Sequence, residues 1–448
     1  MVRYFGTDGI RAKAGVFPLD YNSVYALGRA LVSLAEEETL SRKFLLGRDT
    51  RESGGWLETA FVHGVRDAGG TVLCAGVIPT SAVSLLVKKH GFSAGVVISA
   101  SHNPYQDNGI KLFSSKGWKI DDGWERRLER ALVSPPKSVQ QLNQPIEVVP
   151  SLAEEYRDFL KSKFEGLAGR RPFKVVLDCA NGASSYLAPP LFRELGFEVE
   201  VMACAPDGLN INDGCGSLHP QMLAQKVVES KADLGIAFDG DADRAVWVDE
   251  RGRLLNGDHT LFVQASHMKS EGHLRGGAVV ATPMSNLGLE KALDKLGISL
   301  VRAAVGDRFV LEKMTALGAN LGGEQSGHTI FLDDCPTGDG LLTALKMLEV
   351  MAERGERLSG LVQGFAEFPQ MILNVPVARK DDFQIIPEIM DTMALIREML
   401  KNSGRLEVRY SGTEPLVRIM VEGENKKQVE ELARRMADVL VKHLGHKA

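Results

Sequence analysis

Three aspartates at alternate positions make the sharpest chemical signal in the chain. They are Asp239, Asp241 and Asp243, in the run Asp-Gly-Asp-Ala-Asp-Arg that ends at Arg244. Carboxylates this close repel one another unless a cation lies among them, and hard divalent cations such as Mg²⁺ prefer oxygen ligands. Because apolar segments flank the run on both sides, we favour a metal-binding loop between two strands over a solvated acidic turn. Arg244 beside the cluster suits an anionic ligand.

A calcium-binding EF-hand is a competing interpretation of the same run. Asp239, Asp241, Asp243 and Glu250 fit the first, third, fifth and twelfth positions of such a loop. The sixth position is Arg244, where an EF-hand needs glycine. The flanks, residues 234–238 and 245–248, also indicate strands rather than helices, so the EF-hand is rejected.

A second polar loop carries a candidate nucleophile. The run Ser99-Ala100-Ser101-His102-Asn103-Pro104 follows an apolar segment, and Lys111 lies just downstream. A loop at the end of a strand exposes a hydroxyl, which a serine nucleophile requires. The surroundings are not the Gly-x-Ser-x-Gly of α/β-hydrolases. Taken alone, Ser101 is better explained as a hydrogen-bonding turn residue, and His102 as a structural histidine.

Two further loops carry groups that suit a sugar and a phosphate. In Gly323-Glu324-Gln325-Ser326-Gly327-His328, the glutamate and the serine can bond sugar hydroxyls, although an ordinary polar turn explains this run better when it is taken alone. In Arg409-Tyr410-Ser411-Gly412-Thr413-Glu414-Pro415, followed by Arg418, hydroxyls, backbone amides and arginines suit a phosphate. A hairpin turn with incidental arginines explains that loop about equally well. It lacks the Gly-Lys-Ser/Thr ending of a nucleotide-binding P-loop.

Together the four loops predict one site with a serine, a metal cage, a polyol-binding turn and a phosphate clamp. That set fits phosphoryl transfer through a phosphoserine to a phosphorylated sugar.

A repeated strand–helix–strand pattern is expected to position the first three loops. Strands are expected at residues 43–46, 174–177 and 278–281, each followed by a helix that ends at a glycine and by a second strand, at residues 71–75, 198–202 and 299–303. This alternation predicts mixed α/β sheets, which bind ligands at the carboxyl ends of their strands. From residue 371 the order changes to β-α-β-β-α, which predicts a small α+β domain with an antiparallel sheet. We place the four domains at residues 1–150, 151–252, 253–368 and 369–448.

Helix-start signals mark two of these regions. Ser151 and Glu154 have the spacing of a capping box, and Asn425 is the expected N-cap of the last helix.

Composition excludes several classes of protein. The 448 residues are 44% hydrophobic and 25% charged, with a net charge of −5, so a nucleic-acid binder is not expected. From the polar N-terminal residues and the lack of a long apolar run, we expect neither a secretory leader nor a membrane span. The 5 cysteines are widely spaced, which favours reduced thiols in a cytoplasmic protein.

The four loops, in this order, resemble those of the α-D-phosphohexomutases. The resemblance runs from Phe5-Gly6-Thr7-Asp8-Gly9-Ile10-Arg11 to the last pair of strands, and so covers essentially the whole chain. Within the family, several runs resemble the branch that acts on glucosamine phosphates. They are Gly47-Arg48-Asp49-Thr50-Arg51, Asn210-Ile211-Asn212, Cys215-Gly216-Ser217, Val305-Gly306-Asp307-Arg308 and the loop that contains Gln325.

The resemblance implies four domains around a central cleft, the last of them mobile. Ser101 would be phosphorylated, and its phosphate with Asp239, Asp241 and Asp243 would hold one Mg²⁺ per chain. Substrate would contact Arg244, Glu324, Ser326 and His328 at the sugar, and Arg409, Ser411, Gly412, Thr413 and Arg418 at the non-reacting phosphate. Lys111, His102 and Arg11 are the candidates for proton transfer.

On this reading the ligand is a phosphorylated amino sugar, and glucosamine 1,6-bisphosphate is the intermediate and activator. A mutase of the hexose branch and a catalytically silent sugar-phosphate sensor remain the alternatives. The sequence leaves open whether the chain is a monomer or a homodimer.

Overall fold

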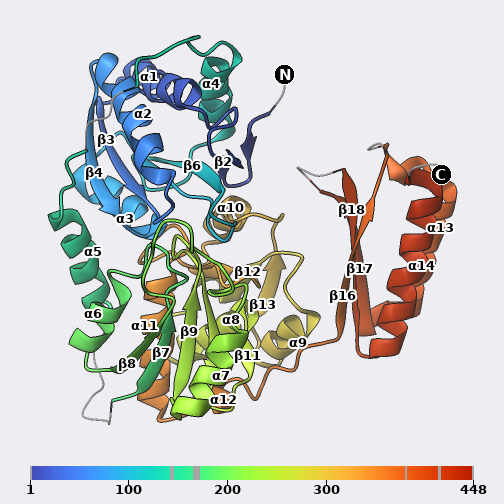
Figure 1. Ribbon diagram of the computed structural model, residues 1–448. Coiled ribbons are helices and arrows are strands. Elements are labelled where there is room, and N and C mark those ends of the chain that lie inside the picture. Colours follow the sequence, from blue (N-terminus) through green and yellow to red (C-terminus); the bar gives the residue numbers. More distant parts are fainter. Residues whose placement is uncertain (1–2, 142–145, 165–171, 379–380, 412–414, 446–448) are drawn as a thin grey trace. The chain divides into compact units, whose positions relative to one another are not determined.

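Short apolar segments form the central strands of three mixed sheets in the computed structural model of the protein (Figure 1). The structure describes residues 3–141, 146–164, 172–378, 381–411 and 415–445. The chain divides into two compact units: unit 1 comprises residues 1–282 and 301–363, and unit 2 comprises residues 283–300 and 364–448.

The first sheet has six strands in the order β1-β2-β6-β5-β3-β4. β3 lies parallel to β4 and β5, whereas β6 runs antiparallel to β5 and β2. Every residue of β5 is buried, which explains its uniformly apolar sequence. The strands are β1 (Phe5–Gly6), β2 (Gly9–Lys13), β3 (Lys43–Arg48), β4 (Thr71–Val77), β5 (Ala94–Ile98) and β6 (Asp107–Ser114); the helices are α1 (Tyr21–Glu37), α2 (Gly54–Asp67), α3 (Thr80–His90) and α4 (Asp122–Val133).

The second sheet has five strands in the order β11-β10-β9-β7-β8. β7 is parallel to β8 and β9, and β10 turns back antiparallel to β9. The turn between β9 and β10 carries the three aspartates. The elements are β7 (Lys174–Asp178), β8 (Glu198–Met202), β9 (Leu234–Phe238), β10 (Ala245–Asp249), β11 (Leu254–Leu255), α5 (Ser151–Lys161), α6 (Ala188–Glu194) and α7 (Gln221–Ser230).

The third sheet has four strands in the order β13-β12-β14-β15. β12 is parallel to β14, and β14 and β15 form an antiparallel pair around the loop with Glu324 and Ser326. The elements are β12 (Ala278–Ala281), β13 (Ser299–Arg302), β14 (Leu321–Gly323), β15 (Thr329–Phe331), α8 (Gly257–Ser270), α9 (Leu287–Lys295), α10 (Asp307–Leu317), α11 (Gly340–Arg354) and α12 (Leu358–Leu361).

The fourth sheet lies in unit 2 and is antiparallel throughout, in the order β16-β18-β17. Two long helices pack against it, and Ile396, Ile419 and Met436 are fully buried in the core between them (Figure 1). The elements are β16 (Gln370–Pro376), α13 (Pro387–Leu400), β17 (Gly404–Tyr410), β18 (Leu416–Gly423) and α14 (Lys426–Leu444).

This architecture confirms the predicted fold class: mixed α/β sheets followed by an α+β region with an antiparallel sheet. One helix signal was correct, because the Asn425 side chain accepts from the backbone amides of Lys427 and Gln428. The capping box was wrong: α5 begins at Ser151 itself, its N-cap position is Pro150, and no side chain caps it. Among the described residues, none of the helices combines the length and apolar character needed to cross a bilayer.

Candidate active site

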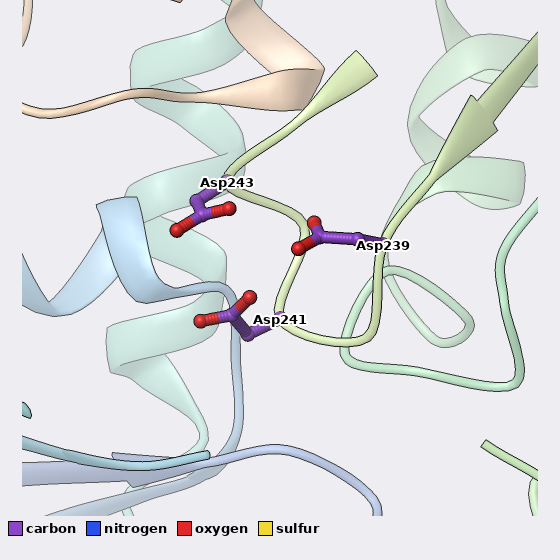
Figure 2. Close-up of side chains that lie close together, drawn as sticks. All are labelled: Asp239, Asp241 and Asp243. Atoms are coloured by element: carbon purple, nitrogen blue, oxygen red, sulfur yellow. The ribbon is translucent and has the colours of Figure 1, made fainter. Parts of the chain in front are cut away.

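The three aspartates point toward one another from a single tight loop between β9 and β10 (Figure 2). Asp239 and Asp241 are fully buried and Asp243 is 3% exposed. One oxygen from each lies within 4.8 Å of the others. Ala242 adopts φ +57°, and its amide closes the loop by donating to the Asp239 carbonyl at 3.0 Å. Local backbone geometry therefore gathers the cluster.

The electrostatics of the cluster suit a divalent cation. Burial, together with Asp243 and Asp241, raises the pKa of Asp239 well above its ordinary value. The Oδ1 atoms of Asp241 and Asp243 are buried and accept no hydrogen bond from the described residues. Buried carboxylate oxygens without donors are costly, and a Mg²⁺ ion would use them as ligands. The donor set of this loop therefore fits the metal that the sequence predicts.

Lys111 provides part of the countercharge. Its ammonium lies 2.7 Å from Asp241 Oδ2, 3.2 Å from Asp243 Oδ2 and 3.0 Å from Asp8 Oδ2. Burial works to lower the pKa of Lys111, but these three carboxylates outweigh it and raise that pKa well above its ordinary value. Lys111 is thus a fixed positive charge at the cluster.

Ser101 lies against the aspartate cluster. Its hydroxyl donates to Asp239 Oδ2 at 2.5 Å, and His102 Nδ1 lies 3.3 Å from the same hydroxyl. Ser101 has φ +54°, a left-handed conformation that is uncommon for a residue other than glycine. Its amide donates to Ser99 Oγ at 2.9 Å, and the Ser99 hydroxyl donates to Asp49 Oδ2 at 2.6 Å. These contacts hold the turn.

Two side chains from distant parts of the sequence donate hydrogen bonds to the Ser101 carbonyl. Arg51 Nη2 and Asn212 Nδ2 each donate to it at 2.9 Å. Gly240 approaches it so closely that a Cβ there would lie 2.5 Å from the carbonyl oxygen. Both Arg51 and Asn212 fall in runs that carry the resemblance, but nothing in their local sequence assigns them this role.

His102 and Arg11, the other candidates for proton transfer, lie in the same charged surroundings. Burial and then Arg244 and Arg11 lower the pKa of His102 to about 4, so the imidazole is neutral near pH 7. Arg11 pairs with Asp8 through Nη2. Burial works to lower the pKa of Arg11, but Asp8 and Asp241 raise it. Both residues thus belong to the surroundings of Ser101 and the aspartates.

The loop between β14 and β15 lies directly beside the metal loop. Arg244 and His328 form an isolated β-bridge, and the Ala245 amide donates to the Gly327 carbonyl at 3.2 Å. Gly327 has φ +97°, and a Cβ there would meet the Ala245 carbonyl at 2.5 Å, so this close approach requires glycine.

Within the same loop, Ser326 Oγ lies 3.4 Å from Glu324 Oε2, and both side chains are half-buried. The His328 ring is 3% exposed, and its Nε2 accepts from the Gly338 amide at 2.9 Å.

Three charged residues near Lys111 were not predicted from the sequence. Asp8 contacts Arg11, Lys111 and Lys119, and Lys119 also contacts Asp307 at 2.5 Å. Burial works to raise the pKa of Asp8, but Lys111, Lys119 and Arg11 hold it well below its ordinary value. Asp8 and Asp307 lie in runs quoted for the resemblance, whereas Lys119 has no sequence signal.

The predicted phosphate loop belongs to unit 2. Arg409 on β17 and Arg418 on β18 are direct partners across the antiparallel pair, so their side chains share one face of the sheet. Burial, and then Arg418, lowers the pKa of Arg409. The Ser411 amide donates to the Leu416 carbonyl at 2.9 Å. Gly412 and Thr413 lie outside the described residues.

Each of the four regions matches a domain of one protein family. Residues 2–136, 154–252 and 256–368 match the α/β/α domains I, II and III of phosphoglucomutase/phosphomannomutase, and residues 372–439 match its C-terminal domain. The predicted boundaries at residues 150, 252 and 368 remain predictions.

Full-length relatives and solved structures show the same similarity. A phosphoglucosamine mutase of Koribacter versatilis is 45% identical, over 98% of this chain and 97% of its own. A phosphoglucomutase/phosphomannomutase family protein of Burkholderia thailandensis superposes with a TM-score of 0.80 at 24% identity, over 99% and 98% of the two chains. An Aspergillus fumigatus N-acetylphosphoglucosamine mutase, solved with GlcNAc-6P and magnesium, gives a TM-score of 0.69 at 18% identity, over 98% and 96%.

Proposed function

Because the chain belongs to the phosphoglucomutase/phosphomannomutase family, we propose that it interconverts glucosamine 6-phosphate and glucosamine 1-phosphate. We infer the amino-sugar substrate from the 45% identity, over nearly the full length, with a relative named phosphoglucosamine mutase. The chemistry rests on the site itself, where the Ser101 hydroxyl contacts the carboxylate cluster at 2.5 Å. In a cell such an isomerase contributes to UDP-N-acetylglucosamine and peptidoglycan precursors.

In the proposed reaction, Ser101 carries the phosphoryl group that is exchanged. The O–P bond to Ser101 Oγ breaks as the free 1-hydroxyl of glucosamine 6-phosphate attacks phosphorus, and the proton of that hydroxyl passes to the departing Ser101 Oγ. Glucosamine 1,6-bisphosphate results. It turns end for end, its 6-phosphoryl group returns to Ser101 Oγ, and glucosamine 1-phosphate leaves.

Loose phosphoryl-transfer transition states are stabilised by positioning and by charge neutralisation. A Mg²⁺ held by Asp239, Asp241, Asp243 and a phosphoryl oxygen on Ser101 would neutralise charge on the transferring group. Lys111 adds a protonated ammonium that already lies at the cluster. Arg51 and Asn212 hold the backbone that aims Ser101.

The remaining residues serve binding and proton transfer. Glu324 and Ser326 would bond the sugar hydroxyls, with Arg244 and His328 beside them, while Arg409, Ser411, Gly412, Thr413 and Arg418 would hold the non-reacting phosphate. Lys111, His102 and Arg11 remain the candidates for moving the proton. Of these, His102 is the one held unprotonated near pH 7, and its pKa of about 4 makes it a weak base. A cytoplasmic location fits the 5 free cysteines.

The test is ³¹P NMR of the purified protein with Mg²⁺ and a trace of sugar bisphosphate. Glucosamine 6-phosphate and glucose 6-phosphate are offered separately and then together. Faster conversion of the amino sugar supports the proposal, whereas preference for glucose phosphate moves the protein to the hexose branch. If Ser101 takes up no phosphate and neither sugar is converted, a sugar-phosphate sensor becomes the better explanation.

A further inference from the structure

Six side chains, one of them Asp243 of the aspartate cluster, form a closed ring, which we call the polar ring. Three carboxylates alternate in it with two ammonium groups and one imidazole, and none of the six side chains is more than 20% exposed. The order is Asp8, Lys119, Asp307, His328, Asp243, Lys111 and back to Asp8. Two lysine links are short: Lys119 Nζ lies 2.5 Å from Asp307 Oδ2, and Lys111 Nζ lies 3.0 Å from Asp8 Oδ2. The imidazole is more loosely placed, with His328 Nδ1 3.6 Å from Asp243 Oδ2 and Nε2, which accepts from the Gly338 amide, 3.4 Å from Asp307 Oδ2.

Lys119 fixes how the Asp8 carboxylate is turned. Its ammonium contacts Asp8 Oδ1, while Arg11 and Lys111 share the other oxygen, Oδ2. Because a carboxylate is planar, a contact that fixes one oxygen also fixes the direction of the other. Arg11 and Lys111 therefore both depend on Asp8 Oδ2, and Lys119 sets the direction of that oxygen through its contact with Oδ1.

Lys119 is itself held rigidly. It pairs with Phe113 in an isolated antiparallel bridge, and the Ser114 amide donates to the Trp118 carbonyl at 2.7 Å. Its ammonium also contacts Asp307, the first residue of α10. Without the ammonium, Asp8 Oδ1 and Asp307 Oδ2 would each lose the cation that joins them, and Lys111 and Arg11 would remain only at the other Asp8 oxygen.

We propose that Lys119 is a positioning residue, which by holding Asp8 and Asp307 fixes the Lys111 ammonium and Asp243 for metal binding and phosphoryl transfer. Lys119 lies outside the metal loop and the predicted substrate loops, and it acts through Asp8. This inference rests on the proposed function and adds to it a residue with no signal in the sequence.

A cavity next to the polar ring makes a specific test possible. It has a volume of about 320 Å³, and Lys119, Asp307 and Lys116 are among its lining residues. A small amine can enter a space of this size once the lysine is shortened. Lys116 is exposed and makes no ion pair among the described residues, so it is the matched control.

The experiment compares Lys119→Ala, Lys119→Arg and Lys116→Ala in the full-length protein. For Lys119→Ala we expect kcat to fall by about 10–100-fold while KM for glucosamine 6-phosphate changes by less than about twofold, since Lys119 contacts no predicted substrate group. Binding of Mn²⁺, followed by EPR in the absence of substrate, should weaken severalfold. Ethylammonium should restore part of the lost kcat in Lys119→Ala only, Lys119→Arg should retain most of it, and Lys116→Ala should match the wild type.

Unchanged kcat and unchanged Mn²⁺ affinity in Lys119→Ala would overturn the inference. So would a loss of activity that ethylammonium and Lys119→Arg both fail to restore, because that result indicates a purely structural role. If Lys119→Ala does not fold, Asp307→Asn replaces it, and wild-type Mn²⁺ affinity and kcat in that variant count against the inference. A wild-type protein inactive on glucosamine 6-phosphate would instead refute the proposed function, while the Mn²⁺ comparison would still decide the role of Lys119.

Discussion

The Ser101 hydroxyl donates a 2.5 Å hydrogen bond to Asp239, a residue 138 positions further along the chain. A hydroxyl in this position places any group attached to Ser101 Oγ directly at the aspartate cluster. The same contact joins the first two sheets of unit 1 at their loop ends. In the proposed reaction, this one contact would place a phosphoryl group on Ser101 beside a metal held by the aspartates.

Replacing Ser101 by alanine should abolish turnover and leave the fold intact. The alanine removes the phosphate carrier and one hydrogen bond, but the carbonyl contacts to Arg51 and Asn212 involve only the backbone of residue 101. The measurement is ³¹P NMR of product formation, with circular dichroism for folding. Ser115→Ala, in an exposed turn, is the matched control. Full activity in Ser101→Ala would refute the phosphoserine assignment.

Replacing Asp239 by asparagine should stabilise the protein without metal and abolish its response to Mg²⁺. The substitution removes one of three buried like charges, and relief of about 1 kcal/mol raises Tm by about 2 °C. In the wild type, Mg²⁺ at about 100 times its Kd should add about 2.7 kcal/mol, and removal with EDTA should reverse this gain. Thermal melts across a Mg²⁺ titration provide the measurement. An equal Mg²⁺ shift in both proteins would contradict the metal site.

The carboxyl of Asp178 should make stability fall as pH rises through the mildly acidic range. Burial raises its pKa from 3.8 to about 6, although the backbone amides of Ala180 and Gly216 act in the opposite direction. The folded state thus binds the proton more tightly than the unfolded state, so this group's contribution is greatest below about pH 4 and is lost by about pH 6.

The size of this effect follows from the difference between the two pKa values. It amounts to at most about 3 kcal/mol, at 1.36 kcal/mol per pH unit. Urea unfolding at a series of pH values, compared with Asp178→Asn, isolates the contribution. Identical pH slopes for the two proteins between pH 4 and pH 6 would show that Asp178 titrates normally.

Replacing Arg409 by glutamine should weaken substrate binding through the phosphate. Arg409 and Arg418 are cross-strand partners, and the pair of like charges is relieved when an anion binds between or beside them. Loss of one charge-assisted hydrogen bond costs about 1.5–3 kcal/mol, which predicts a rise in KM of about 10–100-fold. Steady-state kinetics provide the measurement, and Arg435→Gln, on the exposed side of α14, controls for net charge. An unchanged KM would remove Arg409 from the phosphate site.

Replacing Gly240 by alanine should disturb the Ser101 turn. The new Cβ would lie 2.5 Å from the Ser101 carbonyl oxygen, and such overpacking costs about 1–3 kcal/mol. We expect a lower Tm and a lower kcat together. Gly55→Ala, where a Cβ meets no atom within 4 Å, should be neutral or slightly stabilising. A Gly240→Ala protein with wild-type Tm and kcat would show that the Ser101 turn accommodates the added Cβ without loss of stability or activity.

Sequence patterns predicted the parts of this structure that are local. The strands around the aspartate loop and the alternation in the first three sheets follow from periodicity, because burial on both faces requires continuous apolar runs. Asp239, Asp241 and Asp243 could be grouped because five residues contain them all. The Ser151 capping box failed because a spacing of residue types does not fix where the first helical turn begins.

The supports of the site could not be predicted, since their partners are distant in the chain. Lys119 meets Asp8 and Asp307 only after three segments have folded together, and no spacing of charges encodes that meeting. Arg51 lies at the Ser101 carbonyl, 50 residues away in the sequence. Their local sequence resembles that of any surface charge, although Arg51 is only 1% exposed.

The polar ring also bears on how the protein is made. Asp8 leaves the ribosome near the start of synthesis, whereas Asp307 and His328 emerge only after most of unit 1 has been translated. Because domains generally fold as they emerge, the first two sheets can assemble while the ring still lacks two members. A product released before His328 therefore cannot contain the complete ring.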